Sequence, residues 1–211
     1  MIEKIDSQSL TKIFEKMDDA LSPTSETQTL CIFGAAAILS YGSAARQTQD
    51  IDIWRPASKI NDRAIRQMAF AADLDVDPVE LAPDRIYLQI VDDGVVRLPP
   101  FDIQERRWPG GAPNKLVWSG NKLIVEAPPP AILAAAKLVR ASPQDLEDIA
   151  FLMNAKGLDE DAIMEAVRQL PQEHREIAAD NMVVLALTRQ SNRQRIRPAR
   201  PRAKTGKGLN D

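Results

Sequence analysis

The chain of 211 residues is 44% hydrophobic and 27% charged, which is the composition of an ordinary globular protein. Only 5% of the residues are aromatic, which argues against a stacking platform for single-stranded nucleic acid. The single cysteine, Cys31, excludes an intramolecular disulfide, and no apolar run approaches the roughly 20 residues that span a bilayer. We therefore expect a cytoplasmic protein with no membrane partner.

Positive charge is concentrated at the C-terminal end. The stretch 189–211 holds eight Lys or Arg and one acid, a balance of +7, so residues 1–188 carry −10 of the total charge of −3. This end also has almost no apolar residues, so we expect 191–211 to be a disordered basic tail, or one that a partner orders. Such a tail is able to attract tRNA without sequence preference, or to contact an acidic protein.

The first half of the chain alternates predicted helices and strands. Apolar residues at helical spacing predict a helix over 7–21, with Ser7 as its N-cap. The apolar run 28–33 predicts a short buried strand, which leads into a helix over 35–42. Alternation in 50–54 predicts a second strand, and a further helix follows over 58–74.

The second half is predicted to contain strands first and then only helices. Strands are expected within 84–104, with a turn at Asp93-Gly94 and a separate strand over 101–104 after two prolines. A hairpin is expected over 115–127, turning at 119–121. After the triple proline 128–130, four helices are expected, over 131–141, 143–156, 159–170 and a last one that ends at 190.

These elements predict an α+β fold, in which a mixed sheet with flanking helices precedes a C-terminal helical bundle. We expect the chain to divide into an N-terminal helix (1–23), a sheet-containing domain (24–127), a helical domain (128–190) and the basic tail (191–211).

Two aspartates in the predicted strand 50–54 are the first candidates for chemistry. On a strand, residues two apart point to the same side, so Asp50 and Asp52 project together. Two adjacent carboxylates repel each other, and a cation between them keeps both ionised. Mg²⁺ suits this place because it prefers oxygen ligands and bridges to phosphate. The alternative is a solvent-facing strand whose isoleucines, Ile51 and Ile53, point inward.

A glycine between strand and helix is the second candidate. Gly34 ends the strand 28–33 and opens the next helix, where free N–H groups and the helix dipole favour phosphate oxygens. The alternative is a tight turn without a ligand. The pair Gly42-Ser43 also precedes the two aspartates and is a second candidate for the phosphate side, although it follows a helix rather than a strand.

The order of these features resembles a known family. A strand, the pair Gly34-Ala35, a helix and then Arg46-x-Thr48-x-Asp50-x-Asp52 are similar to the minimal nucleotidyltransferases of the DNA polymerase β superfamily. The resemblance is closest to the abortive-infection and toxin–antitoxin nucleotidyltransferases. That family has a third carboxylate on a neighbouring strand, and a lysine on a later helix followed by an acidic segment. The matching residues here are Asp102, Lys137, Asp145 and Asp148.

The resemblance implies a polymerase-β-like domain that transfers a nucleoside monophosphate from an NTP to a hydroxyl. Asp50, Asp52 and Asp102 are then the ligands of two Mg²⁺ ions, and Asp102 also accepts the proton of the attacking group. The N–H groups of Gly34 and Ala35 hold phosphates. Further roles in phosphate binding fall to Lys137, Arg46, Thr48 and Asp145. The alternative for Arg46 and Thr48 is that they brace the loop before Asp50, and Asp145 also fits a capping box with Ser142.

The acceptor is left open by these motifs. tRNA, a protein hydroxyl and a small molecule are all compatible, and the resemblance adds an antitoxin as a possible partner. The alternative function is a catalytically inactive module that binds a protein partner or a nucleotide. That alternative is favoured by Ala35, where the family has Gly or Ser, and opposed by the intact set of Asp50, Asp52 and Asp102. Gln144, where relatives often have arginine, fits either a specialised enzyme or an inactive descendant.

Overall fold

The computed structural model describes residues 4–80 and 82–196 and has one six-stranded mixed sheet. The strand order is β3-β4-β2-β1-β6-β5. β1 runs antiparallel to β2 and parallel to β6, while β2 runs parallel to β4. The predicted α+β fold with a mixed sheet is therefore confirmed. The strands are β1 (Gln28–Phe33), β2 (Asp50–Trp54), β3 (Asp75–Val76), β4 (Tyr87–Val91), β5 (Lys115–Ser119) and β6 (Leu123–Ala127).

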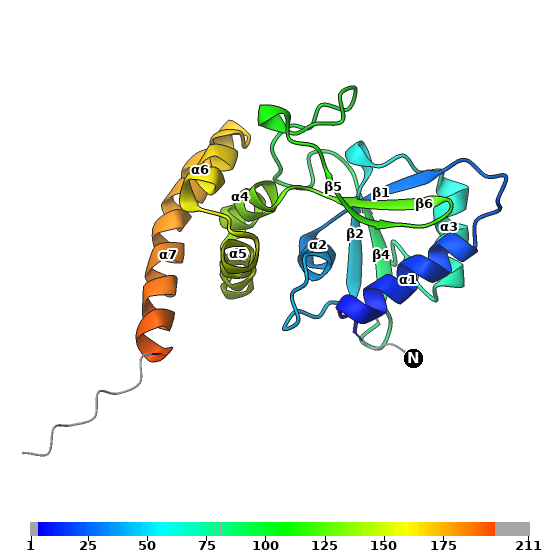
Figure 1. The fold of residues 1–211 in the computed structure, drawn as a ribbon, viewed down its shortest axis with the longest axis horizontal. Helices are drawn as coiled ribbons and strands as arrows, with labels where there is room; N and C mark the ends of the chain where they lie inside the picture. The colour runs from blue at the N-terminus through cyan, green and yellow to red at the C-terminus, as the bar shows by residue number, and fades with distance from the viewer. Residues whose placement is uncertain (1–3, 81, 197–211) are drawn as a thin grey trace, which may run out of the picture.

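Three helices accompany the sheet: α1 (Ser7–Asp19), α2 (Gly34–Ser40) and α3 (Asp62–Ala71). α1 packs against α2 and α3 through its apolar stripe, and α2 packs against β1 and β2 (Figure 1). The predicted N-cap of α1 is wrong by one residue. Asp6 caps the helix, since its carboxylate accepts hydrogen bonds from the backbone N–H groups of Gln8 and Ser9.

A buried acid connects α1 to the β5–β6 hairpin. The carboxylate of Asp18 accepts hydrogen bonds from the backbone N–H groups of Asn121, Lys122 and Leu123, at 2.8, 2.7 and 2.7 Å. A Cβ atom on Gly120 would overlap this carboxylate, so the hairpin approaches α1 as closely as it does only with glycine there. These hydrogen bonds join α1 to the β5–β6 hairpin, which forms one edge of the sheet.

Four helices form the C-terminal part, as predicted: α4 (Pro130–Arg140), α5 (Pro143–Lys156), α6 (Glu160–Arg168) and α7 (Gln172–Ile196). α4 lies at their centre and contacts the other three, and the group packs to one side of the sheet-containing part (Figure 1). The predicted capping box of Ser142 and Asp145 opens α5, which ends at Gly157. Within the described residues, no helix is long and apolar enough to cross a membrane.

The segment between β4 and β5 departs from the prediction. Residues 101–104 form a turn and not a strand, because the carboxylate of Asp102 accepts the backbone N–H groups of Gln104 and Glu105, both at 2.9 Å. Such side-chain bonds compete with strand pairing. The helix predicted over 58–74 is also shorter, since Asn61 caps α3. Most of the predicted basic tail, 197–211, lies outside the described residues, whereas 191–196 belong to α7.

Candidate functional site

A cavity of about 660 Å³ lies between the sheet and the helices α4 and α5. Its walls come from β2, β4, the start of α2 and the loop before β5, together with α4 and the first turn of α5. Eight of the predicted site residues line it, whereas Asp102, Asp148 and the alternative pair Gly42-Ser43 do not. The eight lining residues are Gly34, Ala35, Arg46, Thr48, Asp50, Asp52, Lys137 and Asp145.

The two strand aspartates face this cavity together, as the alternation of β2 requires. Ile51 and Ile53 are fully buried on the opposite side, while Asp50 and Asp52 are partly accessible. The hydroxyl of Thr48 donates a hydrogen bond to the carboxylate of Asp50. Burial and the neighbouring charge of Asp50 raise the pKa of Asp52 to about 7, against the opposing charges of Lys137 and Arg140. Nearby cations therefore balance only part of the negative charge of the two aspartates on β2.

Gly34 is the point where α2 and β2 come closest. It has a φ of +61°, and a Cβ atom there would overlap the carboxylate of Asp52. No side chain caps the N-terminus of α2. Gly42, in contrast, has open space around it and does not line the cavity. Of the two glycine pairs that the sequence offers, Gly34-Ala35 is the one beside the carboxylates.

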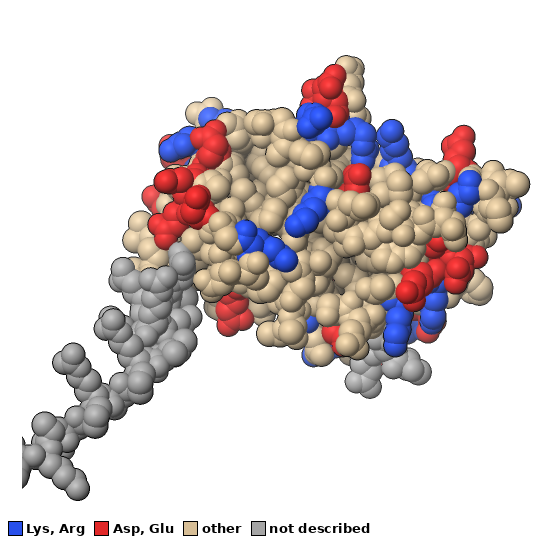
Figure 2. All heavy atoms as spheres, viewed as in Figure 1, with Lys and Arg blue, Asp and Glu red and all other residues tan. Residues whose placement is uncertain are grey.

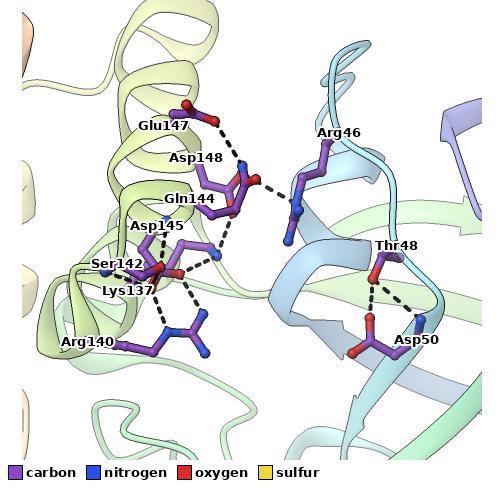
Figure 3. A network of polar contacts seen from close by, with 10 residues as sticks. All are labelled: Arg46, Thr48, Asp50, Lys137, Arg140, Ser142, Gln144, Asp145, Glu147 and Asp148. Carbon is purple, nitrogen blue, oxygen red and sulfur yellow. Dashed lines mark hydrogen bonds and ion pairs between the residues drawn. The ribbon is translucent and has the colours of Figure 1, made fainter. Parts of the chain in front are cut away.

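A cluster of paired charges forms the opposite wall, on α4 and α5 (Figure 3). Lys137 Nζ lies 3.1 Å from Asp145 Oδ1 and 2.7 Å from Asp148 Oδ2. Arg140 donates two hydrogen bonds to Asp145, from Nε at 2.6 Å and from Nη2 at 2.7 Å. The Ser142 hydroxyl donates a further bond to Asp145, at 2.7 Å. This bidentate geometry holds both cations in fixed positions beside the cavity.

Both carboxylates of this cluster lie beside cations. Burial alone would raise the pKa of Asp145, but the hydrogen bonds from Arg140 and Ser142 and the charge of Lys137 outweigh it, so the net shift is downward. The same hydrogen bond to Asp145 raises the pKa of Arg140. Asp148, only 3% exposed, also faces Arg46, whose Nε lies 3.6 Å from Asp148 Oδ1. Arg46 thereby connects the loop before β2 to α5 (Figure 3).

The predicted third carboxylate is not at this site. Asp102 is exposed, does not line the cavity, and uses its carboxylate in the turn described above. On the strand next to β2, the residue in register with Asp52 is Gln89, which does line the cavity. Among the described residues, no group of three or more His, Cys, Asp or Glu is arranged to hold a metal ion. The carboxylates that line the cavity from the sheet are Asp50 and Asp52.

Three polar residues of the cavity lining were not predicted as site residues: Gln89, Arg97 and Arg140. Gln89 occurs as apolar-Gln-apolar in β4, which is the same pattern that drew attention to Asp102. Arg140 follows Lys137 by three residues on α4, so helical spacing alone places both on one face. Arg97 lies on an irregular segment, and no pattern in the sequence indicates where it points. The rest of the lining is apolar: Phe33, Val91, Val95, Val96, Leu98, Leu133 and Ala136.

The mixed sheet, the paired acids on β2 and the cationic wall across the cavity are compatible with a nucleotidyltransferase-like fold. The chain belongs to the DUF6036 family, described as a nucleotidyltransferase of unknown function, whose model matches residues 8–183. No curated protein and no solved structure matches the chain. The closer relation to toxin–antitoxin enzymes and the division into four parts stay predictions.

Proposed function

We propose that the protein transfers a nucleoside monophosphate from an NTP to a hydroxyl group and releases pyrophosphate. The observation that carries this proposal is the cavity with acids on one wall and cations on the other. Asp50 and Asp52 lie on β2, while Lys137 and Arg140 project from α4. A triphosphate with a divalent cation has the complementary arrangement of charges, since the cation sits among phosphate oxygens.

The acids of β2 fit a Mg²⁺ ion shared with the substrate. Mg²⁺ in proteins is commonly bound by one or two carboxylates, with waters and phosphate oxygens completing its shell. Asp50 and Asp52 would hold it, and the raised pKa of Asp52 reflects its burial and then the repulsion from Asp50, which a bound cation would relieve. When bound, the ion neutralises phosphate charge and polarises the reacting phosphoryl group. Two protein carboxylates suit one such ion better than the two ions that the sequence suggests.

The chain's own cations would hold the triphosphate. Lys137 and Arg140 are already fixed by Asp145, so they meet phosphate oxygens without losing much conformational freedom. Arg46 and Arg97 also line the cavity and add positive charge. The backbone N–H groups of Gly34 and Ala35 are the proposed donors on the strand side. The apolar lining would take the base, and the absence of an aromatic side chain other than Phe33 from that lining favours packing over stacking.

The second candidate is a nucleotide-binding module without transfer activity. Two observations favour it: Gln89 stands in register with Asp52, and Lys137 is already paired with two acids. A module of this kind would bind NTP and Mg²⁺ through the same cavity but leave the NTP intact.

Label transfer separates the two candidates. The full chain is incubated with each α-labelled NTP and Mg²⁺, and with tRNA or cell-extract protein as acceptor. Asp52→Asn is the test variant, and Asp102→Asn is the matched control because it changes an acid outside the cavity while keeping an acceptor for the turn. We expect label on an acceptor with wild type and Asp102→Asn only. Label transfer by Asp52→Asn would contradict the proposed transferase. NTP binding without any transfer would instead favour the nucleotide-binding module.

A further inference from the structure

A second cavity, of about 360 Å³, adjoins the first. It lies between the end of β2, the segment 93–103 and the junction of α6 and α7. Val96, Arg97 and Leu98 line both cavities, so a short stretch of backbone forms their common wall. A volume of this size falls within the range of about 300–1,000 Å³ that is typical of ligand sites.

The second cavity begins close to the carboxylates. Asp52 and Trp54 are two residues apart on β2 and therefore point to the same side, separated by about 7 Å along the strand. Trp54 lines the second cavity, while its register partner on β4, Val91, lines the first. A group held beside Trp54 thus lies close to the carboxylates along β2, and proximity of this kind is what a transfer between two bound substrates needs.

An aromatic cluster forms part of the wall of the second cavity, and it contains a buried hydrogen-bond donor for which the described residues provide no partner. Trp54 stacks on Trp108 at 5.1 Å between ring centroids and contacts Phe101 edge-on at 5.7 Å. Trp54 is only 3% exposed, and its Nε1–H has no hydrogen-bond partner. Buried donors are normally paired, because a donor removed from water without a partner destabilises the fold. The nitrogen is itself buried, so a carbonyl or hydroxyl oxygen of a ligand satisfies it only by entering beside the indole ring.

The charge of the lining favours a neutral ligand over a nucleic acid. Two acids, Asp93 and Glu173, balance two arginines, Arg97 and Arg175, and Arg175 already donates to the carbonyl of Leu170 at 2.6 Å. A nucleic-acid strand needs cations without such compensation along its phosphates. Figure 2 shows Lys and Arg on its face as separate groups and no continuous basic band. Aromatic-lined grooves are a recurring way to bind an extended peptide, and Ile103, 64% exposed, adds an apolar contact at the rim.

We propose that the second cavity binds the acceptor, and that the acceptor is a segment of protein chain with a Ser, Thr or Tyr hydroxyl. This inference rests on the proposed function. The hydroxyl oxygen forms a bond to the α-phosphorus of the NTP, and the bond from that phosphorus to the bridging oxygen of the β-phosphate breaks. Pyrophosphate leaves with the electron pair, and the hydroxyl proton passes through the carboxylate of Asp52 to water. The product is a nucleotidylated protein.

The test uses peptide libraries with Ser, Thr or Tyr at the central position, a library with Ala there, and tRNA. Each is incubated with the full chain, α-labelled NTP and Mg²⁺, and NTP binding is followed separately as a thermal shift. Ile103→Asp changes the rim, and Leu116→Asp is its control because Leu116 is 60% exposed on β5 and lines neither cavity. Trp54→Phe removes the unpaired donor and keeps an aromatic ring.

We expect label on the hydroxyl libraries only. Ile103→Asp and Trp54→Phe should raise KM for peptide about tenfold at unchanged kcat, because they remove binding that ground and transition states share. Leu116→Asp should match wild type, and all four chains should show the same thermal shift with NTP and Mg²⁺. Label on tRNA instead of peptide would overturn this inference and leave the transferase intact. A thermal shift without any label would also overturn it, whereas no shift in wild type would overturn the proposed function itself.

Discussion

Aspartates on the two walls of the cavity have pKa shifts of opposite direction. On β2, Asp52 is buried beside another acid, and its pKa rises to about 7. On α5, Asp145 is more deeply buried, yet its hydrogen bonds to Arg140 and Ser142 and its contact with Lys137 lower its pKa. An acid without a partner is available to a cation, and an acid with several partners instead fixes cations in place. This difference is the reason that the proposed function places metal binding on the strand and phosphate positioning on the helices.

The largest expected effect tests the helical wall. Asp145→Ala leaves Lys137 and Arg140 without their shared carboxylate, so we expect a loss of about 3–5 kcal/mol in the free energy of unfolding. Urea denaturation at pH 7 measures it. Asp102→Ala is the control, and loss of its exposed turn contact should cost only about 1 kcal/mol. Equal losses in the two variants would remove the distinction between a structural cluster and a surface acid.

The next effect is a pH dependence of opposite sign at the two walls. Because the pKa of Asp52 rises from 3.8 to about 7 on folding, the folded state retains a proton that the unfolded state releases. The stability of the metal-free protein should therefore fall between pH 4 and pH 7, by at most about 4 kcal/mol. Asp145 acts in the opposite sense, since its lowered pKa contributes stability that is lost only below pH 4.

Denaturation in EDTA at pH 5 and pH 8 measures this slope. Asp52→Asn should flatten it and make the metal-free protein more stable at pH 8, and added Mg²⁺ should restore stability to wild type alone. An unchanged slope in Asp52→Asn would mean that another group titrates.

Gly34 offers a smaller and more local test. Gly34→Ala and Gly42→Ala both place a side chain at positive φ, which costs about 1–2 kcal/mol. Only the Gly34 variant also displaces the carboxylate of Asp52. We expect both variants to melt earlier, and only Gly34→Ala to lose the Mg²⁺-dependent rise in melting temperature. If Gly42→Ala lost that rise as well, Gly34 would have no special place beside the metal ligands.

The smallest expected effect concerns Gln89. Gln89→Asp adds a third carboxylate in register with Asp52, and we expect about tenfold tighter Mn²⁺ binding, or 1.4 kcal/mol. Glu105→Gln removes an exposed acid outside the cavity and serves to check that net charge alone has no effect. Unchanged affinity in Gln89→Asp would place the metal away from β4.

Local patterns in the sequence were enough to predict much of this site. The alternation in 50–54 placed Asp50 and Asp52 on one side, and the capping box placed Asp145 at the start of α5. The pairing of strands that are far apart in the sequence could not be predicted from local patterns. The register of β4 with β2 decides that Gln89 and not Asp102 faces Asp52, and no short-range pattern encodes that register. Asp102 matched the expected motif but made hydrogen bonds within its own turn.

Irregular segments were equally hard to predict. Arg97 reaches both cavities from a segment with neither helical nor strand periodicity, so only the folded chain places it. The salt bridge of Arg46 with Asp148 likewise joins residues from opposite sides of the cavity that are far apart in the sequence.

Counting bound Mn²⁺ ions by electron paramagnetic resonance is the sharpest test of the proposal that Asp50 and Asp52 bind a divalent metal ion. Wild type, Asp52→Asn and Asp102→Asn are each titrated with Mn²⁺ in the presence of a non-hydrolysable NTP analogue. If β2 binds the metal ion, wild type and Asp102→Asn should each bind one ion per chain, and Asp52→Asn should bind none. Retention of the ion in Asp52→Asn, or its loss in Asp102→Asn, would contradict the assignment of metal binding to β2.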